Sequence, residues 1–284
     1  MPLSALSPFF AAIPAAHGGD VSVQRLSAVV LISVVAGIMN SIAGGGTLLT
    51  FPALVGLGIP PITANATSTV ALWPGSVTSM WGYRDALTGA RRWALGFAIP
   101  SLVGGAVGAW LLLHTPEARF AALVPWLVLA ATALFIIQAP LMKAVRARSG
   151  LSDGGVVDTE ADARRTSGFP SPAVLVCQFC FGIYGGYFGA GAGILMLAEL
   201  GLMGLTNIHR MNGLKNWGGM CMNFVAAASF AIGGLVDWRV ALTMAVGAAC
   251  GGYLGSRVAQ RVPQRAVRMA IIAIGLGSGV WLMF

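Results

Sequence analysis

The sequence predicts an all-α fold, a polytopic transmembrane helical bundle made of two inverted repeats. Three observations carry this prediction: charged residues are scarce, apolar runs of bilayer length follow one another along the whole chain, and the two halves resemble each other. Of the 284 residues, 57% are hydrophobic and 9% are charged, whereas a soluble domain carries about a quarter charged residues. Because so few charges cannot cover a water-facing surface, we expect the lipid bilayer to surround the chain.

The charge pattern argues against nucleic-acid binding. The formal net charge is +8, but the cations fall in short clusters between apolar runs, which is how membrane topology is encoded. Residues 1–25 lack the basic start of a signal peptide, so we expect a short extramembrane tail there. Cys177 and Cys180 form a C-x-x-C motif inside an apolar run and are interpreted as packing residues. No metal site and no cofactor are predicted.

Eight apolar runs have close to the ~20 residues that a helix needs to cross a bilayer. They occupy residues 26–43, 61–83, 93–113, 119–140, 171–188, 206–233, 238–256 and 266–284. Two shorter pieces, 46–58 and 190–203, follow the first and the fifth run and are rich in glycine or proline. Each repeat is therefore expected to contain about four long helices plus one short broken segment. The sequence leaves open whether the short pieces cross the membrane or re-enter it.

The one long polar segment, residues 141–170, has the composition of a flexible linker. It divides the chain into transmembrane repeat 1 (26–140) and transmembrane repeat 2 (171–284).

The two repeats are similar in sequence. At an offset of 145 residues, "GIMNSIAGGG" (37–46) aligns with "GIYGGYFGAG" (182–191). At an offset of 147 residues, 92–108 aligns with 239–255, with seven identical positions. Matches in register over two separate stretches indicate an internal duplication.

The distribution of cations favours inverted rather than parallel repeats. Fifteen Lys and Arg residues remain when Arg210 and Lys215, which lie in the sixth run, are set aside. If each half crosses the membrane an odd number of times, twelve of them share one side, whereas four crossings per half place ten there. Odd crossings invert the second half and, by the positive-inside rule, place the linker in the cytoplasm and both termini outside.

Glycine-rich turns precede both short pieces, at Gly44–Gly46 and at Gly189–Gly193. Glycine breaks a helix and lets backbone N–H groups face inward, and helix N-termini suit anions. A pair of interrupted segments at corresponding positions of two repeats is the best sequence indication of a transporter's binding site. The alternative is that these glycines only allow close helix packing, which is the role we assign to the Gly104/Gly108 and Gly251/Gly255 pairs.

A polar stripe crosses the sixth run. On an α-helix the stripe lies on one face, and it consists of Asn212, Lys215, Asn216, Gly219 and Asn223. With the 145-residue offset, Asn65 aligns with Arg210, Thr67 with Asn212, Thr78 with Asn223 and Val70 with Lys215. We expect the polar faces of the two equivalent helices to meet near the middle of the membrane.

Three charged residues inside or beside apolar runs are candidate functional groups. A lysine near the centre of a spanning helix costs about 2.5–3.5 kcal/mol, so Lys215 is expected to face a partner or a wet cavity. The alternative is that Lys215, or Arg210 beside it, extends to the membrane interface. Glu199 either pairs with one of these cations, carries a coupling proton, or caps a turn at the surface.

The segment "AGGGTLLTFPALVGLGIPPITANATS", with the degenerate second copy "FGAGAGILMLAELGL" followed by "NGLKN", resembles the TauE/SafE family of sulfite exporters, also called the domain of unknown function 81 family. The resemblance covers about residues 26–284. By position, the first motif is matched by Gly44, Gly45, Gly46, Asn65, Thr67 and Ser68, and the second by Gly189, Gly191, Asn212, Lys215 and Asn216. Ala190 departs from the pattern, because the first copy has a glycine there.

This resemblance implies a transporter in the bacterial inner (plasma) membrane that exports or exchanges small anions such as sulfite, sulfonates or organic acids. Its partners would be the small anion and the lipid bilayer, and a homo-oligomer stays an open alternative. The sequence carries no H-E-x-x-H or G-x-S-x-G motif and only one acid within an apolar run, so we do not expect an enzyme. It carries no ATP-binding motif, so we expect secondary transport. An anion channel is the remaining alternative.

Overall fold

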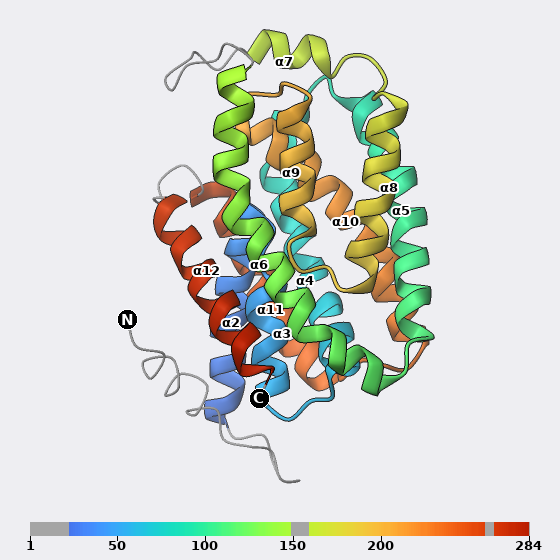
Figure 1. The fold of residues 1–284 in the computed structure, drawn as a ribbon, viewed down its shortest axis with the longest axis vertical. Coiled ribbons are helices and arrows are strands. Elements are labelled where there is room, and N and C mark those ends of the chain that lie inside the picture. Colours follow the sequence, from blue (N-terminus) through green and yellow to red (C-terminus); the bar gives the residue numbers. More distant parts are fainter. Residues whose placement is uncertain (1–22, 149–158, 259–263, 284) are drawn as a thin grey trace.

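The computed structural model describes residues 23–148, 159–258 and 264–283, and within them the chain is helical without a strand. The helices pack side by side as one bundle (Figure 1), so the predicted all-α bundle is confirmed. The elements are α2 (Val23–Ala43), α3 (Thr47–Gly56), α4 (Pro61–Gly82), the 3-10 turn η2 (Arg84–Leu87), α5 (Arg91–Leu113), α6 (Glu117–Arg148), α7 (Thr159–Arg165), α8 (Pro172–Tyr187), α9 (Ala192–Leu202), α10 (Ile208–Ile232), α11 (Trp238–Val258) and α12 (Gln264–Trp281).

Two predicted segments are only partly described. Most of the predicted N-terminal tail, residues 1–22, lies outside the described residues, as do residues 149–158 of the predicted linker. Much of the described linker is helical, because α6 continues to Arg148 and α7 spans Thr159–Arg165, whereas residues 166–170 form a turn.

The same series of helices occurs twice, first as α2–α6 and then as α8–α12, with α7 between them. The short pieces form the short helices α3 and α9, which begin 145 residues apart. The long helices that follow, α4 and α10, begin at Pro61 and Ile208, 147 residues apart. Helix α9 and the connection that follows it are each one residue longer than their counterparts, so the 145-residue alignment of α4 with α10 is wrong by two positions. In the correct register Lys215 corresponds to Ser68, not to Val70.

The two repeats share one core. Helix α5 of the first repeat packs on α8 and α10 of the second, and its counterpart α11 packs on α2 and α4 of the first. Small residues allow this approach: a Cβ on Gly108 would lie 2.7 Å from Tyr187 N, and a Cβ on Gly255 would lie 2.9 Å from Ile38 Cα. The predicted packing role of these glycines is confirmed.

The short helices return toward opposite ends of the bundle. Helix α3 ends beside α12, where a Cβ on Gly56 would lie 3.8 Å from the Trp281 ring. Helix α9 ends beside α7, where the Arg165 guanidinium donates to the Met203 carbonyl at 3.4 Å. In Figure 1, α2 starts and α12 ends at the lower end of the bundle, whereas α7 and the start of α8 lie at the upper end. The inverted orientation of the repeats stays a prediction, and this arrangement fits it.

Large apolar side chains point outward from the bundle. More than half of the surface of each of the following is exposed: Leu31, Ile99, Trp110, Trp126, Val246 and Ile232. Two helical segments, Arg91–Leu113 and Glu117–Ile137, are long and apolar enough to cross a membrane by themselves. An extended apolar exterior of this kind is rare in soluble monomers.

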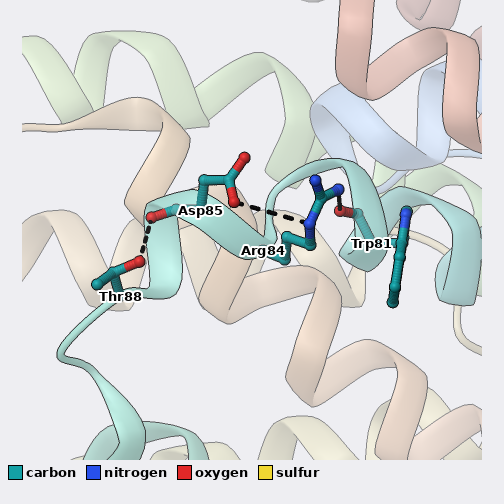
Figure 2. Close-up of polar contacts among 4 residues, drawn as sticks. All are labelled: Trp81, Arg84, Asp85 and Thr88. Atoms are coloured by element: carbon teal, nitrogen blue, oxygen red, sulfur yellow. Dashed lines mark hydrogen bonds and ion pairs between the residues drawn. The ribbon is translucent and has the colours of Figure 1, made fainter.

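The connection from α4 to α5 is a compact polar turn (Figure 2). The Arg84 guanidinium donates to the Trp81 carbonyl at 3.0 Å and lies over the Trp81 ring, 5.0 Å from its centroid. The Thr88 hydroxyl donates to the Asp85 carbonyl at 2.9 Å, and Asp85 pairs with Arg84 at 3.7 Å. A tryptophan packed against a cation is typical of the membrane–water boundary, although an exposed ion pair of this kind adds little stability.

The linker helix α7 is hydrogen-bonded to the start of α10. The Asp162 carboxylate accepts the N–H groups of Thr206 at 3.0 Å and Asn207 at 2.7 Å. The Thr166 hydroxyl accepts from Arg210 Nε at 2.9 Å. Asp162 and Thr166 are 1% and 0% exposed. The linker thus satisfies backbone donors that the start of a helix leaves free.

We expect Asp162→Ala to lower the thermal unfolding midpoint of the detergent-solubilised protein. Loss of a capping carboxylate costs about 0.5–2 kcal/mol, and the buried N–H groups of Thr206 and Asn207 would lose their acceptor. Glu160→Ala, on the exposed side of α7, is the control. Equal midpoints for the two variants would show that the Asp162 contacts do not hold the linker to α10.

Candidate functional site

A small polar cavity lies where the two glycine-rich turns meet the facing helices α4 and α10. Its volume is about 30 Å³, and a single water needs roughly 10–15 Å³ by the same measure. The cavity is therefore nearly closed in this conformation. It is lined by Asn40, Gly44, Thr47, Thr69, Leu72, Ser76, Gly189, Gly193, Met196, Lys215, Asn216, Gly219, Met222 and Asn223.

Equivalent glycines end the first helix of each repeat. Gly44 follows α2 with φ of +81°, and its N–H donates to the Asn40 carbonyl at 3.0 Å. Gly189 follows α8 with φ of +79°, and its N–H donates to the Tyr184 carbonyl at 3.2 Å. Glycine adopts this left-handed conformation without the penalty that a Cβ brings, which is why it commonly ends helices.

Each glycine-rich turn joins two helices into a hairpin, α2–α3 in the first repeat and α8–α9 in the second. The backbones of these two hairpins touch beside the cavity. A Cβ on Gly44 would lie 2.7 Å from Gly193 Cα, and a Cβ on Gly193 would lie 2.8 Å from Gly44 Cα. Neither position can hold a side chain without moving the other hairpin. The contact brings the turn after α2 and the start of α9 together beside the cavity.

Lys215 lies in the interior and not at the membrane interface. Its side chain is 2% exposed, and its Nζ donates to the carbonyls of Asn40 at 3.0 Å and Ser41 at 2.9 Å. These carbonyls belong to the last turn of α2, which carries partial negative charge. The lysine stem passes Gly193, where a Cβ would lie 3.2 Å from Lys215 Cδ. Lys215 therefore joins the end of α2 to α10 and faces the cavity, as the sequence predicted.

The polar faces of α4 and α10 meet across the cavity. With the 147-residue register, Thr69 corresponds to Asn216 and Ser76 to Asn223, and all four line the cavity. The Asn216 side chain donates to the Ser41 carbonyl at 3.3 Å. The predicted meeting of two polar faces is therefore observed, although through residues two positions away from those aligned in the sequence.

Other predicted site residues of the first repeat hold the structure around the cavity. The Asn65 amide donates to the Tyr187 carbonyl at 3.0 Å, and the Thr67 hydroxyl accepts from Asp237 N at 3.0 Å. The Ser68 hydroxyl bonds to that of Thr50 at 2.5 Å. None of these three side chains lines the cavity.

The remaining glycines and Asn212 are also buried beside the cavity and not in its wall. Gly45 and Gly46 are buried, and Gly46 is the residue before α3. Gly191, with φ of +80°, precedes α9, and a Cβ there would lie 3.3 Å from that of Ala131. Asn212 is 3% exposed, and its side-chain oxygen has no hydrogen-bond partner among the described residues.

The two charged candidates are not partners of Lys215. The Arg210 guanidinium donates to the Thr166 hydroxyl and to the Thr88 carbonyl at 3.2 Å, so it connects α10 with α7 and η2. Glu199 is 5% exposed, and neither carboxylate oxygen has a hydrogen-bond partner among the described residues. The described structure contains no ion pair of Glu199 with Lys215 or Arg210, so the expected pairing is not formed in this conformation.

Sequence reasoning missed five cavity residues, Asn40, Thr47, Leu72, Met196 and Met222. Asn40 could have been found, because it is the one amide in the first apolar run and lies four residues before Gly44. Its Nδ2 donates to the Ser76 hydroxyl at 3.3 Å, which connects α2 to α4. The two methionines gave no signal, because methionine is common in apolar helices.

Comparison with known proteins agrees with this description. A family model described as sulfite exporter TauE/SafE matches residues 29–282. The chain is 27% identical over 232 residues to a probable membrane transporter protein of Haemophilus influenzae, covering 81% of this chain and 83% of that protein. It is 29% identical over 235 residues to the probable membrane transporter protein YfcA of Escherichia coli K12, covering 80% and 78%.

A third relative is the probable membrane transporter protein ORF9 of a Sinorhizobium species, 29% identical over 231 residues and covered at 80% in both chains. No solved structure matches the chain. The family model spans nearly the whole sequence, including both hairpins and the polar faces of α4 and α10. The chain is therefore a multi-pass membrane protein that belongs to the TauE/SafE sulfite exporter family.

Proposed function

We propose that the protein is a secondary transporter that exports or exchanges small anions of the sulfite, sulfonate or organic-acid type through the cavity between the two repeats. The observation that carries this proposal is the Lys215 ammonium at the cavity wall. It bonds to two carbonyls and forms no ion pair among the described residues. Helix carbonyls supply partial charges only, so an anion in the cavity would supply the missing full negative charge.

The other groups of the wall suit an oxyanion. The amides of Asn216 and Asn223 and the hydroxyls of Thr69 and Ser76 line the space beside the ammonium. In this conformation the two hydroxyls donate to the Asn65 and Leu72 carbonyls, and they would turn toward a bound anion. The small volume favours a compact anion, and a larger organic acid would require the hairpins to separate. Because Gly44 and Gly193 touch at this place, movement of one hairpin against the other would open the cavity toward one end of the bundle, as alternating access requires.

A transport assay separates this function from its rivals. Purified protein in proteoliposomes loaded with sulfite should show saturable counterflow of external [35S]sulfite. Flux that does not saturate and shows no counterflow would indicate the channel alternative. Sulfite converted to another compound would indicate an enzyme. Thermal-shift screening with sulfite, thiosulfate, sulfonates and short carboxylates would identify the preferred anion class.

We expect both termini in the periplasm and the linker in the cytoplasm of a bacterial inner membrane. This follows from the inverted orientation that we propose, with the start of α2 and the end of α12 at one end of the bundle and α7 at the other (Figure 1). Reporter fusions active on only one side of the membrane, placed at each terminus and within 149–158, would measure it. A terminus on the linker's side would contradict the inverted arrangement.

We expect Gly219→Leu to fold and to lose sulfite counterflow. Gly219 lines the cavity, and a Cβ there would meet no atom within 4 Å, so the leucine side chain would enter the space that the anion needs. Removing a glycine from a helix interior favours folding by roughly 0.5–1 kcal/mol. Ala228→Leu, on the exposed face of the same helix, is the control and should keep counterflow. Normal counterflow in Gly219→Leu would place the anion path elsewhere.

A further inference from the structure

Glu199 is a buried acid that the anion site does not use. It lies on α9, is 5% exposed, and neither of its carboxylate oxygens has a hydrogen-bond partner among the described residues. We propose that Glu199 is a proton-binding site that couples anion movement to the proton gradient. This inference rests on the proposed transport function and adds its driving ion.

The position of Glu199 connects the cavity to one end of the bundle. Gly193 and Met196, earlier on α9, line the cavity, and Glu199 follows Met196 by three residues, on the neighbouring part of the same helix face. Beyond Glu199, α9 ends at Leu202, and the carbonyl of the next residue, Met203, accepts from Arg165 of the linker helix. The acid thus lies between the anion cavity and the end of the bundle that carries α7, on a helix whose start touches the opposite hairpin.

Few ionisable groups face Glu199 from the helices packed on α9, which are α2, α6, α8 and α10. From α8, the thiols Cys177 and Cys180 are exposed, and the Tyr184 hydroxyl donates to the Ala190 carbonyl at 2.6 Å. From α10, the stem of Lys215 contacts α9 at Gly193. The Arg210 guanidinium is bonded to Thr166 and Thr88.

The other two helices offer no compensating charge within residues 27–43 and 117–137, whose side chains the structure describes. Residues 27–43 of α2 contain no ionisable side chain. The acid of α6, Glu117, accepts from Ile62 N at 3.0 Å, at the start of α4, and Arg119 is exposed. No described cation therefore forms an ion pair with Glu199.

An ionised carboxylate in this place would have neither a cation nor a hydrogen-bond donor. The effective penalty for such a buried ion is several kcal/mol, and it falls when the group becomes neutral. Glu199 therefore holds a proton in this closed conformation. When movement of the hairpins admits water from one end of the bundle, the Glu199 carboxyl releases its proton to that side. When water enters from the other end, the carboxylate takes up a proton there, and the protonated side chain is then buried again. No covalent bond to carbon and no electron transfer is involved.

The coupling is tested in proteoliposomes with [35S]sulfite. The external pH is held constant and the internal pH is varied. The accumulation ratio is calculated for one ionic form of sulfite on each side, because the ionisation of internal sulfite changes with the internal pH. For wild-type protein, one pH unit should change the accumulation ratio about tenfold if one proton moves per anion. Glu199→Gln should keep counterflow, which needs no driving force, but its accumulation should no longer respond to the gradient. Glu117→Gln, which removes an exposed acid, should behave as wild type.

The outcomes separate this inference from the proposed function. Absence of counterflow in the wild type would refute anion transport itself, and with it the coupling. Normal counterflow without a pH response in the wild type, or a wild-type response in Glu199→Gln, would overturn the assignment of Glu199 alone. If Glu199→Gln loses counterflow, Glu199→Asp decides: recovery of both counterflow and the pH response supports a proton site. Loss of counterflow in both variants would assign Glu199 a structural role in the fold and would overturn the proposal.

Discussion

Lys215→Met is expected to abolish sulfite binding while leaving a folded protein. The ammonium is the one full positive charge in the cavity wall, and removing one partner of a buried, hydrogen-bonded charge pair typically costs about 2–5 kcal/mol of binding free energy. Binding of [35S]sulfite to the purified protein, measured by scintillation proximity, would give the affinity of each variant. Wild-type affinity in Lys215→Met would remove the lysine from the site.

The folded state of this variant needs its own control, because Lys215 also bonds to the end of α2. Both carbonyls keep another donor in Lys215→Met, because the Gly44 N–H donates to the Asn40 carbonyl and the Asn216 amide to the Ser41 carbonyl. The lost hydrogen bonds to a charged group contribute about 1.5–3 kcal/mol each, and removal of a buried ammonium offsets part of this. Lys215→Gln retains a donor without the charge. It should unfold at a higher temperature than Lys215→Met and bind sulfite equally poorly.

Gly44→Ala is expected to be the most damaging change at the contact between the hairpins. A residue with a Cβ pays roughly 1–2 kcal/mol to adopt the φ of +81°. The new methyl group would also lie 2.7 Å from Gly193 Cα, and overpacking typically costs a further 1–3 kcal/mol. We expect a large fall in the thermal unfolding midpoint in detergent, together with loss of sulfite counterflow.

Two other glycines separate the contributions to this effect. Gly58 has φ of +84° and open space around its Cβ position, so Gly58→Ala carries the backbone strain without the clash. Gly193 does not have a positive φ, so Gly193→Ala carries the clash without the strain. Gly44→Ala should be more damaging than either. If Gly44→Ala and Gly58→Ala unfold at the same temperature, the hairpins do not touch as described.

Much of the fold could be predicted from the sequence, because lipid imposes strong rules. Scarce charge and apolar runs of bilayer length predicted the helical bundle, and the fold class and the family are confirmed. The glycine turns were located correctly because a helix ending at Gly44 or Gly189 needs a positive φ there, which few other residues adopt. The short helices were found for the same reason, since each begins just after such a turn.

The register of the polar helices could not be predicted by extending the first alignment. Helix α9 is one residue longer than α3, and the connection after α9 is one residue longer than the connection after α3. Such changes of length in a connection have little effect on packing. The resulting error of two positions hid the correspondence of Ser68 with Lys215. The same error matched Thr67 with Asn212 of the polar stripe, whereas Thr69 is the threonine that lines the cavity.

The partners of Lys215 were invisible in the sequence for a different reason. Backbone carbonyls of Asn40 and Ser41 accept its protons, and a carbonyl is present at every residue, so no residue type marks the position. Glu199 was therefore the one candidate partner for Lys215 among the side chains, because it is the acid that lies within an apolar run. Only the packing of α10 against the end of α2 shows that the ammonium already has acceptors.

The most direct measurement is a crystal structure of the protein with bound selenite, whose selenium gives an anomalous signal and whose shape and charge match those of sulfite. A bound trigonal anion should sit between the Lys215 ammonium and the two facing polar helices, near the point where the hairpins cross. A selenium peak at Arg210, or on the outer surface, from protein that still shows sulfite counterflow would contradict the central claim.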